Sequence, residues 1–210
     1  MGIGGSLAAL GPTATLSYAL ARAGAKSGLF AWHRYRIIAV PVSAMPAMPR
    51  GHNARLIDAA ELAGHAIDAD AATQHARFGA GLACIGAFAG DQLVGVNWLA
   101  TGHHDEDEVD ARYVLPADAA WDTGLWVPPE RRMGRAFAAI WAGTADWLAE
   151  RGLARSMSRI ADYNSASIAA HARMAARTVA TVAFLSLGPV QFCIGARPRL
   201  GGATVDLRGC

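Results

Sequence analysis

The sequence predicts a mixed α/β domain, and three features of the chain support that fold class. Residues 82–89 and 92–100 are two apolar runs joined by a Gly-Asp turn, which is typical of a pair of antiparallel strands. A further apolar run at 121–127 precedes apolar side chains that recur at helical spacing over 137–148. Residues 154–176 repeat this order of strand and helix. Strands and helices that alternate in one chain indicate an α/β fold.

The N-terminal part of the chain is expected to contain a short helix, a strand and a helical segment. After a flexible start over 1–13, residues 14–25 suit a short helix. Residues 34–42 alternate in polarity and predict a strand. The prolines that follow, up to Pro49, favour an extended connection without a helix. Residues 56–78 then predict helix in one or two pieces.

The C-terminal part is expected to hold the remaining strands and one long helix. Residues 101–110 are rich in charge and predict a loop, and 111–115 suit a short strand. The helix that follows the strand at 121–127 is expected to end at Gly152, which can adopt a left-handed conformation. A closing hairpin is predicted from strands at 179–187 and 191–196, around a Gly-Pro turn.

Composition limits the class of protein. The chain has 210 residues, 53% of them hydrophobic and 17% charged, which is enough for one domain with a sizeable core. The absence of an 18-residue apolar run argues against a membrane-spanning helix. Three scattered cysteines in no metal-ligand spacing (Cys84, Cys193 and Cys210) favour a reduced, cytoplasmic protein. Without a recognisable nucleic-acid-binding motif, we expect no nucleic-acid partner.

The N-terminal segment is basic, although the net charge of the chain is only +2. Six basic residues precede the first acidic residue, Asp58, and large apolar residues lie among them. This combination suits peripheral contact with anionic lipid on the inner face of a membrane. The alternative is a leader whose apolar residues cover one end of the core. We expect a flexible or short-helical basic leader at 1–33 and a single domain at 34–210. The six basic residues are Arg22, Lys26, Arg34, Arg36, Arg50 and Arg55.

The loop between the strand at 121–127 and the long helix has the character of a phosphate-binding loop. The N–H groups of a first helical turn lack intrahelical partners, and the helix dipole adds about half a positive charge there. Gly134 allows a phosphate to approach the backbone. Arg131, Arg132 and Arg135 supply positive charge.

Two segments resemble the GNAT superfamily of acyl-CoA N-acyltransferases. Arg131-x-x-Gly134-x-Ala136, after a strand that ends in Val-Pro, is similar to that family's Arg/Gln-x-x-Gly-x-Gly/Ala signature. At the family's usual distance, residues 160–176 resemble its strand–Asn–helix segment. The resemblance covers roughly residues 80–196 and leaves the first part of the chain outside it.

The resemblance implies a fold, a co-substrate and a set of binding residues. The fold would be a GNAT-like mixed, mostly antiparallel sheet, flanked by helices, with splayed central strands. The co-substrate would be acetyl-CoA or another acyl-CoA, with its pyrophosphate on the loop and its pantetheine beside the preceding strand; no metal is required. The implied cofactor-binding residues are Trp126, Val127, Arg131, Arg132, Met133, Gly134, Arg135, Ala136, Asn164 and Ser167.

Acyl transfer from a thioester to an amine needs a group that removes a proton from the amine, because an ammonium has no lone pair at neutral pH. Asp122 begins the strand that should line the thioester, so we predict it to be the base. Glu130 would point at the wrong end of the cofactor. The alternative is that Asp122 caps the strand or pairs with Arg112.

The leaving thiolate needs a proton, which a Tyr supplies in many GNAT proteins. Here that place resembles His171, which shares one predicted helix face with Asn164 and Ser167. Tyr163 is a second candidate for the acid. The alternative is a surface or core-edge His without a catalytic role. The family's usual Gly-aromatic pair at the end of this helix is replaced by Ala at 175–176.

The stretch His103–Glu108 gathers metal-ligating side chain types, but consecutive residues rarely converge on one ion. We therefore predict a solvated loop there. The functional alternative is that the acidic side chains of this loop attract a cationic amine.

Three functions follow as hypotheses. The first is N-acetyl transfer to a small amine or to an amino group of a polymer. The second uses a long-chain acyl-CoA or acyl carrier protein to acylate an amino lipid or amino acid. The third is a GNAT module that binds CoA or a partner without catalysis.

Overall fold

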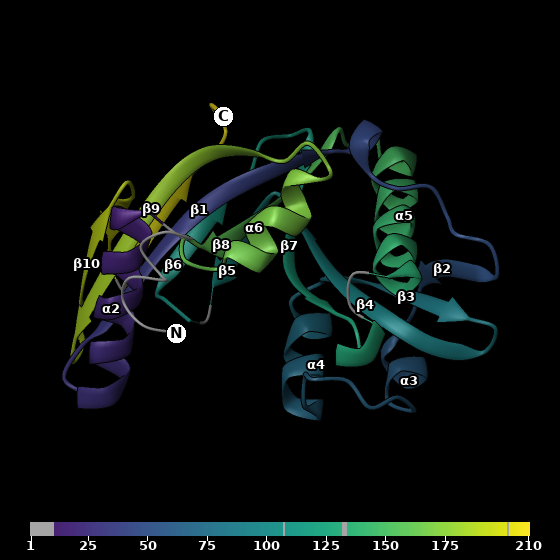
Figure 1. The fold of residues 1–210 in the computed structure, drawn as a ribbon, viewed down its shortest axis with the longest axis horizontal. Coiled ribbons are helices and arrows are strands. Elements are labelled where there is room, and N and C mark those ends of the chain that lie inside the picture. Colours follow the sequence, from purple (N-terminus) through teal and green to yellow (C-terminus); the bar gives the residue numbers. More distant parts are fainter. Residues whose placement is uncertain (1–10, 107, 132–133, 201) are drawn as a thin grey trace. The chain divides into compact units, whose positions relative to one another are not determined.

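The computed structural model describes residues 11–106, 108–131, 134–200 and 202–210 (Figure 1). The chain divides into two compact units that alternate along the sequence. The first unit contains the chain up to Ala39 together with Asp105–Pro116 and Ser158–Cys210, and the second contains Val40–His104 and Ala117–Met157.

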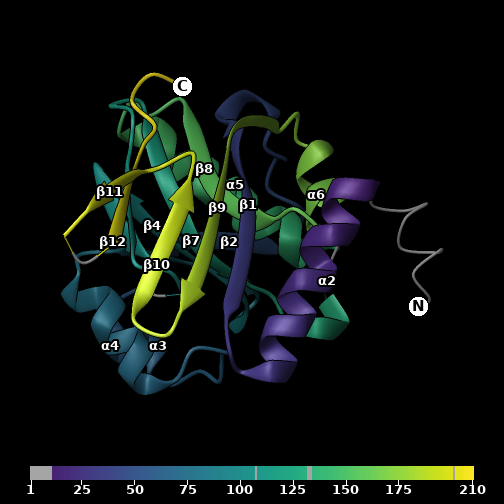
Figure 2. The same cartoon turned by 90° about the vertical axis from the view of Figure 1, so that its left-hand side faces the viewer.

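The first unit is built on antiparallel strands with an N-terminal helix beside them. Strand β1 pairs with β9, and β9 forms a hairpin with β10 that turns at Gly188. Strand β1 lies between β9 and β8, and Figure 2 shows α2 beside β1. The elements are α2 (Pro12–Ser27), β1 (Ala31–Pro41), β5 (His103–Glu106), β6 (Ala111–Val114), α6 (Ser165–Ala172), β9 (Arg177–Leu187), β10 (Val190–Ile194), β11 (Arg197–Arg199) and β12 (Gly202–Asp206). A smaller sheet has the order β11-β12-β6-β5, with β12 and β6 parallel.

The second unit holds strands in the order β8-β7-β4-β3-β2, and α5 packs on β2, β3 and β4. Of β8, only Arg155–Met157 belong to this unit, and the rest of the strand belongs to the first. The close approach depends on Gly143, where an added Cβ would lie 2.3 Å from the Cβ of Ala54 on β2. The elements are η1 (Val42–Ala44), β2 (His52–Leu56), α3 (Ala59–Leu62), α4 (Ala71–Gly79), β3 (Ala83–Ala89), β4 (Gln92–Thr101), β7 (Ala119–Trp126), η2 (Pro129–Arg131), α5 (Arg135–Glu150) and β8 (Arg155–Ala161).

Most predicted elements are present, and the mostly antiparallel α/β fold is confirmed. The helix predicted at 14–25 is α2, and Gly152 has a φ of +67° just after α5. The segment at 56–78 forms two helices, α3 and α4. Strand β7 pairs in parallel with β8 over Ala119–Trp121. The separation of these two central strands that was predicted beyond Trp121 involves residues of both units, and it stays a prediction.

Several expectations differ from the structure. The charged loop predicted at 101–110 is wrong, because residues 103–106 form β5. The connection after β1, which was expected to be extended, contains a 3-10 turn, η1. The boundary predicted after residue 33, between the basic leader and the domain, falls inside β1. Strands β2, β11 and β12 were not predicted. The expectation of a flexible start over 1–13 concerns residues 1–10, which lie outside the described residues, while α2 already begins at Pro12.

The end of α6 shows the consequence of a missing glycine. Ala175 has a φ of +54°, the one positive value at a non-glycine residue in the described part of the chain. A left-handed conformation costs an L-amino acid roughly 1–2 kcal/mol. The N–H groups of Ala175 and Ala176 nevertheless bond back to the carbonyls of Ala172 and His171, which ends the helix.

Candidate functional site

Strand β7 carries a β-bulge at Asp122. Leu99 of β4 pairs with Asp122 and Trp98 pairs with Gly124, so Thr123 is the extra residue on β7. Bulges redirect side chains and are frequent beside functional sites. The hydroxyl oxygen of Thr123 is buried and has no hydrogen-bond partner among the described residues. Such a group is uncommon in proteins and is often satisfied by a water or a ligand.

The carboxyl group of Asp122 is in an environment that suits proton transfer at neutral pH. Only 8% of the residue is exposed. Burial raises the pKa of Asp122 to about 7, although the N–H of Gly124 and the positive charge of Arg77 act in the opposite direction. Arg77 comes from α4, and its guanidinium lies over the ring of Trp98 at 5.3 Å. A carboxyl with this pKa can both accept and release a proton near pH 7.

The structure identifies Arg77 as a charged neighbour of Asp122 that the sequence did not reveal. No spacing in the sequence links α4 to β7, so only the fold brings the two together. Arg112, the alternative partner suggested for Asp122, instead uses its Nε and Nη2 atoms to donate to Asp105, each at 2.6 Å.

The predicted phosphate loop leads from β7 into α5 and lines a surface pocket. Gly134 is the N-cap of α5 and provides no side chain to satisfy the first N–H groups of the helix. Arg131 donates from Nη2 to the side-chain oxygen of Gln92 at 2.9 Å, so its guanidinium is tied to β4. Arg132 and Met133 lie outside the described residues. The pocket has a volume of about 270 Å³ and is lined by His52, Glu130, Arg131, Gly134, Arg135 and Ala136.

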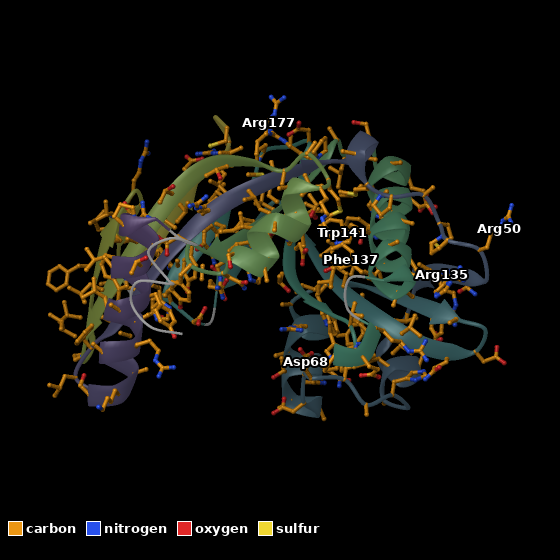
Figure 3. All side chains as sticks on the ribbon, viewed as in Figure 1. Arg50, Asp68, Arg135, Phe137, Trp141 and Arg177 are labelled. Carbon is orange, nitrogen blue, oxygen red and sulfur yellow. The ribbon has the colours of Figure 1, made fainter. Side chains whose placement is uncertain are left out.

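The residues on either side of this loop are held by packing. Trp126 packs against an apolar cluster of the second unit, and Val127 is buried. On α5, Arg135 projects from the first turn on the side opposite to Phe137 and Trp141 (Figure 3). The rings of Phe137 and Trp141 contact each other, with centroids 6.2 Å apart. The loop is therefore anchored at both ends, with Arg135 exposed.

The second predicted motif is the start of α6. Asn164 is the N-cap of this helix, and its side-chain oxygen accepts from the N–H of Ser167 at 3.1 Å. Nδ1 of His171 lies 2.8 Å from the carbonyl oxygen of Ser167, which places a proton on Nδ1. Burial lowers the pKa of His171, so the ring is neutral at pH 7. The ring of Tyr163 contacts that of Tyr18, and burial raises the pKa of Tyr163, which keeps its proton.

The predicted site residues belong to both units. The second unit contains Asp122, Trp126, Val127 and the loop at 130–136. The first unit contains Tyr163 and the residues of α6. Within the second unit, the structure brings Asp122, Arg77 and the bulge together.

The acidic stretch is engaged in ion pairs rather than solvated as a loop. Both oxygens of Glu106 accept from Arg159, and Glu108 accepts from Arg159 at 2.8 Å and from the hydroxyl of Tyr35 at 2.7 Å. Within the described residues, no group of three or more His, Cys, Asp or Glu side chains could hold a metal ion. Asp107 lies outside the described residues.

Comparison with known proteins establishes the fold. No protein-family model and no curated protein sequence matches this chain. Among solved structures, a tandem GNAT protein from the clavulanic acid biosynthesis pathway superposes with a TM-score of 0.50 at 17% identity, over 80% of this chain and 58% of that one. A conserved protein of unknown function from Staphylococcus epidermidis gives a TM-score of 0.51 at 10% identity, over 78% of this chain and 64% of that one.

The chain therefore has the fold of this GNAT protein, as the two motifs implied. It spans somewhat less than two thirds of the length of these two structures. No helix of the described residues is long and apolar enough to cross a membrane.

Proposed function

We propose that this protein is an N-acyltransferase that moves an acyl group from a CoA thioester to an amine by direct attack in a ternary complex. The observation that carries the proposal is Asp122, a buried carboxyl with a pKa near 7 at a bulge in the strand that leads to the phosphate loop. Placing a thioester beside an amine lowers the barrier by several kcal/mol through proximity alone, roughly 7–11 kcal/mol at best.

The residues of the loop fit an anionic co-substrate. Arg131 and Arg135 line the pocket, and the uncapped first turn of α5 offers N–H groups to a pyrophosphate. Acyl-CoA would supply the activated acyl group and a thiolate leaving group. No metal or covalent enzyme intermediate is needed for this transfer.

The proton steps can be assigned to residues of this chain. Asp122 would take a proton from the acceptor ammonium, leaving the neutral amine to attack, because the pKa of Asp122 allows it to be ionised in part of the population at pH 7. His171 and Tyr163 are the candidates for protonating the leaving thiolate. Since burial lowers the pKa of His171, His171 would act as an acid mainly on the acidic side of neutrality. Tyr163 keeps its proton at neutral pH.

A long-chain acyl group and an amphiphilic acceptor form the second candidate. The observation that favours it is an exposed apolar row on one face of β10, formed by Val190, Phe192 and Ile194, which are 51%, 56% and 70% exposed. With the basic residues of α2, this row suits a cytoplasmic protein that contacts an anionic membrane peripherally. The donor would then be a long-chain acyl-CoA or acyl carrier protein, and the acceptor an amino lipid or amino acid.

The test compares two glycine variants. An added Cβ at Gly134 would meet only the carbonyl oxygen of Arg131, at 3.5 Å, and at Gly64 only that of Glu61, at 3.6 Å. Both Gly134→Leu and Gly64→Leu should therefore fold. Gly134→Leu should lose CoA binding in calorimetric titration, whereas Gly64→Leu should keep it. Equal CoA affinity in the two variants would show that the loop is not the CoA site.

Turnover distinguishes the remaining hypotheses. Acyl-CoA donors of graded chain length, tested with simple amines and with amino lipids, should show release of free CoA. CoA binding without release for any donor would indicate a binding module instead of an enzyme.

A further inference from the structure

Two cavities of the first unit lie between α2 and the strands β1 and β9. We call them together the α2 groove. One, of about 420 Å³, is lined by Thr13, Leu16, Ser17, Leu20, Trp32, Arg34, Thr181, Val182, Ala183 and Ile194. The other, of about 410 Å³, is lined by Gly11, Pro12, Thr13, Ala14, Arg34, Arg36, Thr178 and Thr181. Thr13, Arg34 and Thr181 line both, so the cavities adjoin.

The first cavity is apolar, and its wall follows from the strand register. Arg34, Ala183 and Ile194 are neighbours across β1, β9 and β10, and the small side chain of Ala183 leaves space between its larger neighbours. Trp32 donates from Nε1 to the hydroxyl of Ser17 at 3.0 Å, which holds α2 against β1. Each cavity is of the size that proteins use for small ligands, about 300–1,000 Å³.

The second cavity is polar and positively charged. Arg34 and Arg36 lie two residues apart on β1 and therefore share one face of the strand. Arg34 pairs with the buried carboxylate of Asp162, but no described residue forms an ion pair with Arg36. Thr178 and Thr181 add hydroxyl groups, and the N-terminus of the 16-residue helix α2 faces the same cavity. No carboxylate is among the residues that line it.

We propose that the α2 groove binds a single-chain anionic amphiphile, a long-chain carboxylate. The guanidinium of Arg36 matches the two oxygens of a carboxylate. The adjoining apolar cavity would take the chain, between the leucines of α2 and Trp32. In a molecule of this kind the charged head meets the cationic cavity while the chain fills the apolar one. Small anions would lack the apolar contacts, and cationic amphiphiles would be repelled by Arg36.

Binding in the groove can be observed at one residue. Trp32 lines the apolar cavity, and the five other tryptophans, Trp98, Trp121, Trp126, Trp141 and Trp147, all lie in the second unit. A dodecanoate that carries bromine on its chain should quench part of the tryptophan fluorescence of the full-length protein. The quenched part should be the fluorescence of Trp32, so the quenching should disappear in Trp32→Phe.

The affinity test uses monomeric dodecanoate, well below its micelle concentration, in calorimetric titration. Arg36→Gln should weaken binding by about tenfold or more, because a charge-assisted hydrogen bond is lost. Ala183→Leu, which fills the apolar cavity, should also weaken dodecanoate binding, because the hydrocarbon chain of the ligand then lacks space. Lys26→Gln removes the same charge from an α2 residue outside both cavities and should leave the affinity unchanged.

Three controls define the ligand. Acetate should not bind measurably, and dodecyltrimethylammonium should bind at least tenfold more weakly than dodecanoate. The proposal is overturned if Lys26→Gln weakens binding as much as Arg36→Gln, or if the cationic amphiphile binds equally well. It is also overturned if anionic phospholipid vesicles bind the protein while monomeric dodecanoate does not, because the face would then be a membrane surface. Circular dichroism of each variant confirms that the fold is intact.

Discussion

Replacing Asp122 by Asn should make the protein more stable at alkaline pH. The folded-state pKa of about 7 lies above the ordinary aspartate pKa of 3.8, so the folded protein binds more protons than the unfolded chain between these values. Stability therefore falls as the pH rises through this window, and the loss is complete above pH 7. Asn has the same shape, can still accept from the N–H of Gly124, and does not titrate.

The size of the effect follows from the shift in pKa. A difference of about 3 units at about 1.36 kcal/mol per unit corresponds to about 4 kcal/mol between acidic and alkaline pH. For a chain of this length, about 1 kcal/mol changes the melting temperature by roughly 2–4 °C. The melting temperature of Asp122→Asn minus that of the wild type should thus grow by about 10 °C from pH 4 to pH 8.

The assay is thermal unfolding of both proteins followed by circular dichroism from pH 4 to pH 9. Taking the difference between the two proteins cancels the other titrating groups, including His33 and His171, whose pKa values burial lowers. Melting curves that shift in parallel across the whole range would refute the reasoning, because Asp122 would then titrate alike in the folded and unfolded chain.

Three further predictions concern the other unit. Ala175→Gly should raise the free energy of unfolding by about 1 kcal/mol in urea denaturation, because it relieves a left-handed alanine, whereas Ala172→Gly within α6 should lower it by a similar amount. If His171 is the acid, His171→Gln should remove the alkaline fall in turnover while CoA binding persists; an unchanged pH profile, with turnover lost in Tyr163→Phe, would assign the role to Tyr163. Phe192→Ser should reduce co-sedimentation with anionic vesicles at low salt, and wild-type binding should fall at high salt, where the Debye length drops below about 8 Å; equal sedimentation of both proteins would exclude β10 as the contact.

Local rules predicted those elements whose signals lie within a few residues. Two apolar runs joined by a Gly-Asp turn predicted the hairpin of β3 and β4, and Gly152 marked the end of α5. Asn164 was expected to open a helix, and it caps α6. In each case the residues that decide the structure are close together in the sequence.

The failures share a different cause, because each depends on residues far apart in the chain. Charge predicted a loop at 101–110, yet Glu106 is buried against Arg159, and that pairing stabilises β5 as a strand. The position of Asp122 on a strand was predictable, but its partner Arg77 and the bulge at Thr123 come from the packing of α4 and β4. Strand β1 was recognised as a strand, whereas its place between β8 and β9 was not.

The place of β1 has a consequence for how the protein is made. Both strand neighbours of β1 come much later in the chain: β8 begins at Arg155, 114 residues after β1 ends at Pro41, and β9 begins at Arg177. At about 5–20 residues per second, synthesis of this stretch takes roughly 6–23 s, during which an apolar strand has no neighbouring strand. Such a strand is a target for chaperones and a risk for aggregation. A shortened protein that starts at residue 34 would lack the beginning of this strand, and we expect it to be poorly soluble when expressed.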